Sequence, residues 1–250
     1  FRGFPALISG LGFLGLMSLS WSSLSLILTR CMPKTQGRKL GRHVITQGFR
    51  LYLRFLSRMG FVHIDLGDLH KLAAIQSPCI VAPNHPGLLD AVLLIAAFPD
   101  IGCILKADIL DIPFFGAGAR LAGYIRNDKR QRMIRESVRE LKEGGRLLLF
   151  PEGTRTTQDP VNPFKDGPAL IARKAGVPLQ TILIEYNCAF LGKNWPLFKV
   201  PDLPIYVSLR LGQRFDPSLS SRETTRCMEA YFKHALNKSN AFQTPTQNGI

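Results

Sequence analysis

The first part of the chain is a long stretch without any charge. No acidic or basic residue occurs from Gly3 to Thr29, and Phe4 to Leu28 is apolar apart from serines, glycines and one proline. Because an α-helix rises about 1.5 Å per residue, this stretch is long enough to cross a bilayer or to lie in one leaflet as a helical hairpin. We therefore expect the N-terminal segment to associate with a membrane.

A block of basic residues follows this stretch and indicates its orientation. The block contains Arg30, Lys34, Arg38, Lys39 and Arg42. Such a cluster favours the cytoplasmic side of a membrane, so we expect the inner membrane, with the rest of the chain on its cytoplasmic side. A cleaved signal peptide is the alternative, since Arg2 precedes the apolar run. No small-x-small cleavage pattern follows, however, and the basic block disfavours export.

The segment from Val44 to Met59 has the pattern of an amphipathic helix. Apolar residues recur at helical spacing, while arginines occupy another face. Two arrangements fit this pattern equally well. The helix lies on anionic headgroups, or it packs its apolar stripe into the globular part of the chain.

The formal net charge of +14 calls for an anionic partner. A nucleic acid and an anionic membrane both attract such a protein, and the uncharged N-terminal stretch favours the membrane. We therefore expect anionic lipids as partners and no nucleic acid. The five cysteines are scattered and the five histidines lack metal-ligand spacing, so we expect neither a disulfide framework nor a metal site.

The remainder of the chain alternates between short apolar runs and helical patterns. Strands are predicted at Phe61–Leu66, Cys79–Ala82, Cys103–Leu105, Leu147–Phe150 and Pro178–Ile184, and helices at Asp90–Phe98, Lys129–Glu143 and Ala169–Ala175, with a helix or turn at Leu69–Ile75. Asn127 or Asp128 is the expected cap of the second helix. This alternation predicts an α/β fold with a mixed, largely parallel sheet flanked by helices.

The same pattern divides the chain into three parts. Residues 1–58 form the expected membrane-anchoring segment and amphipathic helix, and residues 59–236 form the expected globular domain. Residues 237–250 are polar and lack apolar periodicity, which is typical of a disordered tail.

Asn-His-Pro-Gly-Leu-Leu-Asp at positions 84–90 follows one predicted strand and offers a base. His85 lies in the loop, and Asp90 lies in the first turn of the next helix. The carboxylate can accept the Nδ1 proton of His85 and leave Nε2 free to act as a base. No Gly-x-Ser-x-Gly elbow and no cysteine near His85 supplies a nucleophile, which points to a substrate alcohol that attacks an acyl carbonyl. The alternative is a histidine that only caps or fills the core.

Phe-Pro-Glu-Gly-Thr-Arg at positions 150–155 follows another predicted strand and offers an anion clamp. Gly153 allows the backbone to approach a ligand closely. Arg155 can hold a phosphate with two hydrogen bonds, and Thr154 adds a donor. Glu152 has two possible roles, because it can accept hydrogen bonds from substrate hydroxyls or pair with Arg155.

Together, N-H-x-x-x-x-D and F-P-E-G-T-R resemble the motifs of the glycerolipid acyltransferase family, whose best-known bacterial members are 1-acyl-glycerol-3-phosphate acyltransferases. The resemblance covers roughly Phe61 to Val207. It implies transfer of a fatty acyl group from acyl-CoA or acyl carrier protein to a hydroxyl of a lysophospholipid, with no other cofactor. It also implies that His85 is the general base, that Asp90 orients it, and that the acceptor is bound by Glu152, Gly153 and Arg155.

Further positions match the family less closely. Lys106 before Pro113–Gly116 resembles a lysine of the family, whereas Gly87 stands where many members have serine. The block around Arg126, Lys129 and Arg130 departs from the Asp-Arg pattern of the family, and each of these three residues is a candidate for the acceptor phosphate. Lysophosphatidic acid is the leading acceptor, and another lyso-lipid or a specialised acyl acceptor is the alternative. A non-catalytic lipid-binding protein and a thioesterase are the rival functions.

Overall fold

The structure is a computed structural model, and it describes residues 3–69, 71, 77–188, 191–196 and 199–238. The described helices are α1 (Gly3–Cys31), α2 (Lys34–Arg58), α4 (Leu89–Ala97), α5 (Ala107–Asp111), α6 (Pro113–Leu121), α7 (Arg130–Lys142), α8 (Gly167–Ala175) and α9 (Ser221–Lys238). The expected helix or turn at Leu69–Ile75 lies mostly outside the described residues.

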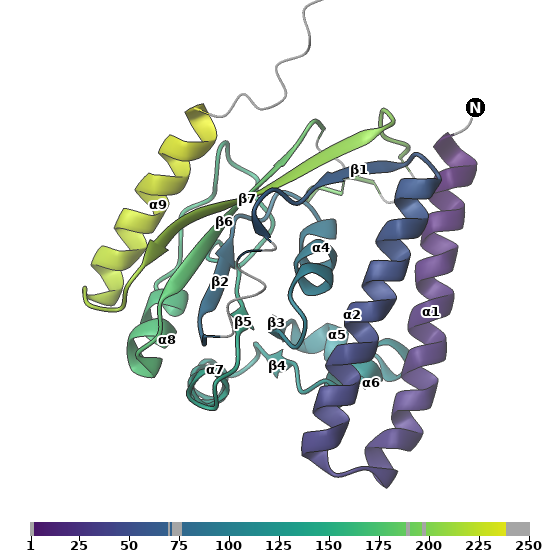
Figure 1. The fold of residues 1–250 in the computed structure, drawn as a ribbon, viewed down its shortest axis with the longest axis horizontal. Coiled ribbons are helices and arrows are strands. Elements are labelled where there is room, and N and C mark those ends of the chain that lie inside the picture. Colours follow the sequence, from purple (N-terminus) through teal and green to yellow (C-terminus); the bar gives the residue numbers. More distant parts are fainter. Residues whose placement is uncertain (1–2, 70, 72–76, 189–190, 197–198, 239–250) are drawn as a thin grey trace, which may run out of the picture.

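A seven-stranded sheet forms the centre of the molecule (Figure 1). Its strands are β1 (Val62–Asp65), β2 (Ile80–Pro83), β3 (Gly102–Leu105), β4 (Ile125–Arg126), β5 (Leu147–Leu148), β6 (Leu179–Tyr186) and β7 (Ile205–Phe215), in the order β1-β7-β6-β2-β5-β3-β4. All neighbours pair in parallel except β6 and β7, which are antiparallel. The predicted mixed, largely parallel sheet is therefore confirmed.

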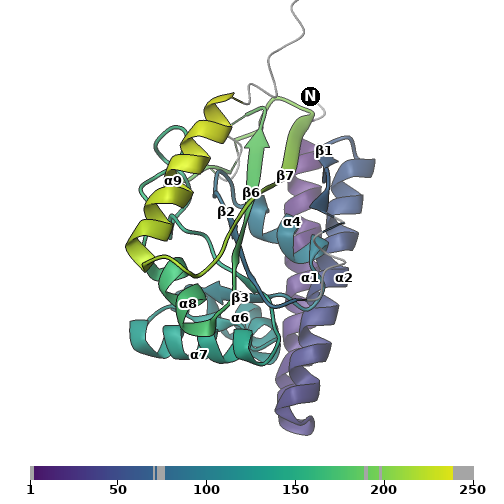
Figure 2. The same ribbon diagram turned by 60° about the vertical axis from the view of Figure 1, so that its left-hand side comes forward.

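Helices cover both faces of this sheet (Figure 2). Helices α2 and α4 pack on one face with α1 outside them, and α7, α8 and α9 lie on the other. The alternation of side chains along β2 explains why both faces are apolar. Ile80 and Ala82 belong to the core under α8 and α9, whereas Val81 belongs to the core under α2 and α4. A strand that is buried on both sides reads as a continuous apolar run.

Helices α1 and α2 form an antiparallel hairpin along one side of the molecule (Figure 1). The rings of Phe13 and Phe55 lie 4.8 Å apart, and a Cβ added at Gly10 would lie 3.1 Å from Leu56. The span Leu7–Cys31 is long and apolar enough to cross a membrane, judged by length and composition. The outer face of α1 carries exposed large apolar side chains: Phe4, Ile8, Leu16, Leu19, Leu24 and Ile27.

Of the two arrangements proposed for Val44–Met59, the structure has the inward-packed one. Tyr52, Leu53 and Leu56 are buried against the domain. On the same helix, Thr46 Oγ1 donates to the Ile95 carbonyl and Arg50 Nε donates to the Ala96 carbonyl. The apolar stripe of α2 is thus part of the core and is not laid on headgroups.

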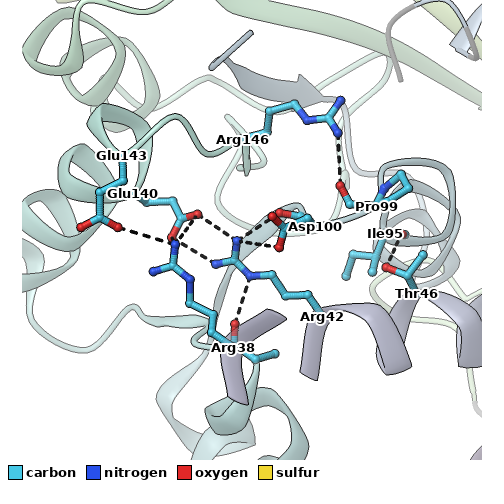
Figure 3. A network of polar contacts seen from close by, with 10 residues as sticks. Arg38, Arg42, Thr46, Ile95, Pro99, Asp100, Glu140, Glu143 and Arg146 are labelled. Atoms are coloured by element: carbon cyan, nitrogen blue, oxygen red, sulfur yellow. Dashed lines mark hydrogen bonds and ion pairs between the residues drawn. The ribbon is translucent and has the colours of Figure 1, made fainter. Parts of the chain in front are cut away.

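A buried ion pair joins α2 to α7 (Figure 3). The guanidinium of Arg42, 2% exposed, donates to both carboxylate oxygens of Glu140 on α7 at 2.9 and 3.1 Å. It also donates to the carbonyls of Asp100 and Ala122 at 3.0 and 3.1 Å. Arg38 reaches the same Glu140 carboxylate at 3.2 Å. All three guanidinium nitrogens of Arg42 therefore donate to acceptors inside the protein.

This network corrects the interpretation of the basic block. Arg30 lies in the last turn of α1 and the other four residues lie in α2, where Arg38 and Arg42 are bound to Glu140. Two charges that were used to predict orientation at the membrane thus stabilise the fold. Sequence spacing alone gives no sign of this, because Glu140 is distant in the chain.

The ends of two helices also differ from expectation. Helix α7 begins after Lys129 without a side-chain cap, because Asn127 Oδ1 accepts the backbone N–H of Ala107 and Asp128 Oδ1 accepts that of Lys129. The predicted capping is therefore wrong. Helix α9 extends to Lys238, so residues 237 and 238 are helical and not part of a tail. The rest of the expected disordered tail, residues 239–250, lies outside the described residues.

Gly41 permits the close crossing of α2 over the end of α6. A Cβ at this position would lie 2.7 Å from the backbone nitrogen of Ala122, and backbone cannot move aside as a side chain can. We expect Gly41→Ala to lower the free energy of unfolding by about 1–3 kcal/mol, because it overpacks this contact. Chemical unfolding in detergent measures the change.

Gly12→Ala on α1 is the matched control for this prediction. No atom lies within 4 Å of a Cβ at Gly12, so its replacement is expected to stabilise the helix by up to about 1 kcal/mol. Equal effects of the two replacements would contradict the close-contact explanation.

Candidate active site

The candidate site lies at one edge of the sheet, where the parallel strands end. Strands β4, β3, β5, β2 and β6 run in the same direction, so their carboxyl ends meet there. The first residues beyond β2 and β5 lead into the two sequence motifs. Open α/β sheets gather their ligands at this edge, because the loops that follow the strands are free to form a site.

His85 and Asp90 are in direct contact. Nδ1 of His85 lies 2.8 Å from Oδ2 of Asp90, and the imidazole stacks on the ring of Phe150 with centroids 3.8 Å apart. The short turn from β2 into α4 brings the aspartate back to the histidine. With Nδ1 directed at the carboxylate, Nε2 is the nitrogen left for a proton acceptor role.

The carboxylate of Asp90 is completely buried and accepts hydrogen bonds from three groups. Oδ2 accepts from the Gly87 backbone N–H at 2.9 Å as well as facing His85, and Oδ1 accepts from the hydroxyl of Tyr186 at 2.7 Å. Burial raises the pKa of Asp90, and these hydrogen bonds oppose that rise. Burial and the neighbouring carboxylate also raise the pKa of Tyr186 well above its usual value, so its hydroxyl keeps its proton.

Glu152 holds the two motifs together. It is 1% exposed, and its Oε1 accepts from the His85 backbone N–H at 2.9 Å and the Thr156 hydroxyl at 2.8 Å. Its Oε2 accepts from the Asn162 backbone N–H at 2.9 Å. The resemblance implied that Glu152 binds the acceptor, but the structure directs its oxygens to donors of the protein itself. Neither oxygen is recorded in a pair with Arg155.

The loop after β5 bends sharply at Gly153. This residue has a φ of +69°, a conformation that side chains rarely adopt, and a Cβ there would lie 2.8 Å from Nζ of Lys165. Thr154 is half-buried beside it. Nη1 of Arg155 donates to the carbonyls of Leu191 and Gly192 at 2.9 and 3.0 Å. Nη1 of Arg155, a residue that was expected to bind phosphate, is thus hydrogen-bonded to the loop after β6.

The four other basic candidates are distributed unevenly over the same edge. Lys106 follows β3 and is exposed, and Lys129 and Arg130 are exposed at the start of α7. Arg126 instead forms ion pairs with Asp111 at 2.5 Å and Asp128 at 3.0 Å. The hydrogen bonds from Arg126 lower the pKa of both carboxyl groups. Of the four, Arg126 is the one whose charge is already matched by acidic neighbours.

Sequence reasoning missed several residues of this site. Tyr186 ends β6 on the same edge, one strand from His85, but the predicted strand stopped at Ile184. Asn162 accepts from the backbone N–H groups of Thr157 and Gln158 and so shapes the loop after Arg155. The rule that placed the two motifs at strand ends would have found Tyr186 had the strand been extended. No sequence signal marks Asn162, because its partners are set by the loop conformation.

Among the described residues, no group of three or more His, Cys, Asp or Glu is placed to hold a metal ion. One edge of the sheet carries a histidine–aspartate pair, an exposed set of cations and a loop bent at a glycine. This arrangement suits proton removal beside an anionic substrate.

A family model described as Acyltransferase matches residues 63–185. These residues form an acyltransferase domain, in agreement with the family that the motifs resemble. The chain is 31% identical over 129 residues to a chloroplastic 1-acyl-sn-glycerol-3-phosphate acyltransferase from Brassica napus, a match that covers 50% of this chain and 38% of the relative. It is 25% identical over 182 residues to a 1-acyl-sn-glycerol-3-phosphate acyltransferase from Pseudomonas aeruginosa, covering 70% and 67%.

The fold has a counterpart among solved structures. The 1-acyl-sn-glycerophosphate acyltransferase PlsC from Thermotoga maritima superposes with a TM-score of 0.74 at 22% identity, over 97% of this chain and 98% of that one. The likeness extends beyond the domain to nearly the whole chain, and it confirms the predicted fold class.

Proposed function

We propose that this protein is an O-acyltransferase that moves a fatty acyl group from a thioester donor, acyl-CoA or acyl carrier protein, to a hydroxyl of a lysophospholipid. The contact between His85 Nδ1 and the buried Asp90 carboxylate is the observation that carries this proposal. Among the described residues, no serine or cysteine is hydrogen-bonded to this histidine, which fits attack by a substrate alcohol.

The reaction follows from the direction of the imidazole. Nε2 of His85 takes the proton of the acceptor hydroxyl while the hydroxyl oxygen forms a bond to the thioester carbonyl carbon. The carbon–sulfur bond of the resulting tetrahedral intermediate then breaks, and the thiolate takes the proton back from the imidazolium. Asp90 stabilises the transient imidazolium and needs no proton of its own. The proposal requires no metal and no cofactor apart from the acyl donor.

The acceptor class is inferred from the cations at the same edge. Lys165 lies over Gly153, and Lys106, Lys129 and Arg130 are exposed near the ends of β3 and β4. These charges suit a phosphate, and we propose 1-acyl-glycerol-3-phosphate as the acceptor, which gives phosphatidic acid. Arg155, with Nη1 bonded to backbone carbonyls of the loop after β6, contributes positive charge to this edge.

We also propose that the exposed face of α1 lies in the cytoplasmic leaflet of the inner membrane. The opposite face of α1 packs on α2 and α6, so the domain accompanies the helix along its length. Leu88, between His85 and Asp90 in the chain, and Ile109 on α5 are exposed as well. Exposed apolar side chains in the loops and helices that follow β2 and β3 suit a substrate that is drawn from a bilayer.

An acceptor panel tests the proposed function. The purified protein is given labelled acyl-CoA or acyl-acyl carrier protein with lysophosphatidic acid, lysophosphatidylcholine or lysophosphatidylethanolamine in mixed micelles. We expect phosphatidic acid as the major product, formed faster than the other diacyl lipids. Free fatty acid as the sole product would identify a thioesterase, and no turnover with any pair would favour a non-catalytic lipid-binding protein.

A further inference from the structure

Tyr186 is the one side chain on β6 that reaches the buried carboxylate of the candidate dyad. Its hydroxyl donates to Oδ1 of Asp90 at 2.7 Å, on the oxygen opposite the one that faces His85. We propose that Tyr186 is a positioning residue that keeps Asp90 ionised and thereby keeps His85 available as a base at neutral pH. This inference rests on the proposed function and adds a residue to its site.

Burial makes the negative charge of Asp90 costly in free energy. The side chain is completely buried, and an ionised carboxylate in that position is stable only when hydrogen-bond donors replace water. The Gly87 N–H and His85 serve Oδ2, whereas Tyr186 is the donor recorded on Oδ1 among the described residues. Without the Tyr186 hydroxyl, Oδ1 of Asp90 would have no hydrogen-bond donor among the described residues, and this disfavours the ionised carboxylate.

The charge of Asp90 decides which nitrogen of a neutral His85 carries the proton. An ionised carboxylate can only accept hydrogen bonds, so a neutral His85 must carry its proton on Nδ1 and leave Nε2 unprotonated. A protonated Asp90 can donate to Nδ1 instead, and His85 would then carry its proton on Nε2 and fail as a base. The tyrosine hydroxyl therefore acts on the reaction through the carboxylate.

The net charge of the dyad sets the direction in which the acid limb of the kcat/KM profile moves. The active form of the dyad carries a neutral imidazole and a buried negative charge, whereas the protonated form carries no net charge. The Tyr186 hydroxyl stabilises the negative form more than the neutral one, so its loss makes the dyad hold its proton to higher pH. The acid limb of the pH profile must then move to higher pH.

Other titratable and charged groups surround the dyad. Besides His85 itself, they are Glu152 after β5, Tyr186 and Cys188 at the end of β6, and Arg50 of α2 at the far end of α4. Of these, Tyr186 and His85 contact the Asp90 carboxylate. Tyr186→Phe removes one hydroxyl and leaves the rest of this set in place.

Tyr186→Phe is therefore the test variant, and Tyr124→Phe is its matched control. The hydroxyl of Tyr124 is also buried, but the structure records no hydrogen-bond partner for it among the described residues. We expect Tyr186→Phe to shift the acid limb of kcat/KM upward by about 0.5–1 pH unit, which is a loss of about 3- to 10-fold on that limb. Tyr124→Phe is expected to leave the limb in place.

Two further measurements separate a positioning role from a structural one. The first is the imidazole titration of His85 by NMR, which we expect to shift by the same amount in Tyr186→Phe even without substrate. The second is Asp90→Asn/Tyr186→Phe, which we expect to be no slower than Asp90→Asn, since the hydroxyl acts through Asp90.

The outcomes are distinguishable. An unchanged acid limb and an unchanged His85 titration in Tyr186→Phe would overturn the inference while acyl transfer by the wild type stands. Absence of acyl transfer in the wild type, with the His85 titration still shifted in Tyr186→Phe, would overturn the proposed function and leave the hydrogen-bond relation intact. Additive losses in the double variant would overturn the route through Asp90.

Discussion

Replacing His85 with alanine is expected to lower kcat/KM for acyl transfer by about 10²- to 10⁴-fold, the usual contribution of a general base. The imidazole is half-buried, and its Nδ1 is bound to Asp90, so its removal takes away the proton acceptor without opening the core. Product formation from labelled acyl donor at saturating acceptor measures the loss. His43→Ala, at an exposed histidine of α2, is the control and is expected to keep the wild-type rate.

Asp90→Asn completes this prediction. The amide group keeps the shape of the carboxylate but has one acceptor oxygen, and it presents N–H groups where His85 or Tyr186 now donate. The histidine would then carry its proton on Nε2, and we expect a loss of similar size to that of His85→Ala. A variant of either residue that keeps more than about a tenth of the wild-type rate would contradict the role of this pair as base and orienting group.

The second large effect concerns stability. Arg42→Met leaves the Glu140 carboxylate, 4% exposed, without its bidentate partner, and we expect the free energy of unfolding to fall by about 3–5 kcal/mol. Arg38, which also contacts Glu140, is partly exposed and replaces little of this interaction. Denaturant unfolding in detergent, followed by circular dichroism, measures the change. Arg54→Met, at an exposed arginine of the same helix, is expected to stay within about 0.5 kcal/mol of the wild type.

The double variant Arg42→Met/Glu140→Leu separates the loss of a contact from the burial of an unpaired charge. When both charges are replaced by apolar groups, no ion is left in the core, and most of the lost stability is expected to return. If the double variant is as unstable as Arg42→Met, the unpaired carboxylate is not the cause. In that case the hydrogen bonds from Arg42 to the carbonyls of Asp100 and Ala122 would carry the stability.

Residue patterns within short segments predicted the central strands and the contact between His85 and Asp90 in the first motif. Strand β2 begins within one residue of its predicted position, because a strand buried on both faces is a continuous apolar run bounded by polar residues. The contact of His85 with Asp90 was foreseeable for a similar reason, since a short turn into a helix brings the two side chains together. Interactions within a few residues depend mainly on local backbone geometry.

Interactions between distant segments were not predictable in this way. β7 pairs antiparallel with β6, a pairing that no local pattern signals. Asn84 shows the same limit, because both its side-chain oxygen and nitrogen bind the backbone of Ile184 on β6. Such partners are chosen by the strand order, and strand order results from packing of the whole domain.

By itself the sequence determined the apolar helix at the N-terminus, the strands that alternate with helices, and the two motifs that resemble those of the glycerolipid acyltransferases. Only the tertiary structure decided that Arg42 is buried in an ion pair with Glu140 and that Glu152 accepts a hydrogen bond from the His85 backbone. It also decided that the Tyr186 hydroxyl donates to Asp90. The physical reason is that periodicity and turn chemistry act over a few residues, whereas the partner of a buried charge is whichever donor the fold brings within 3 Å of it.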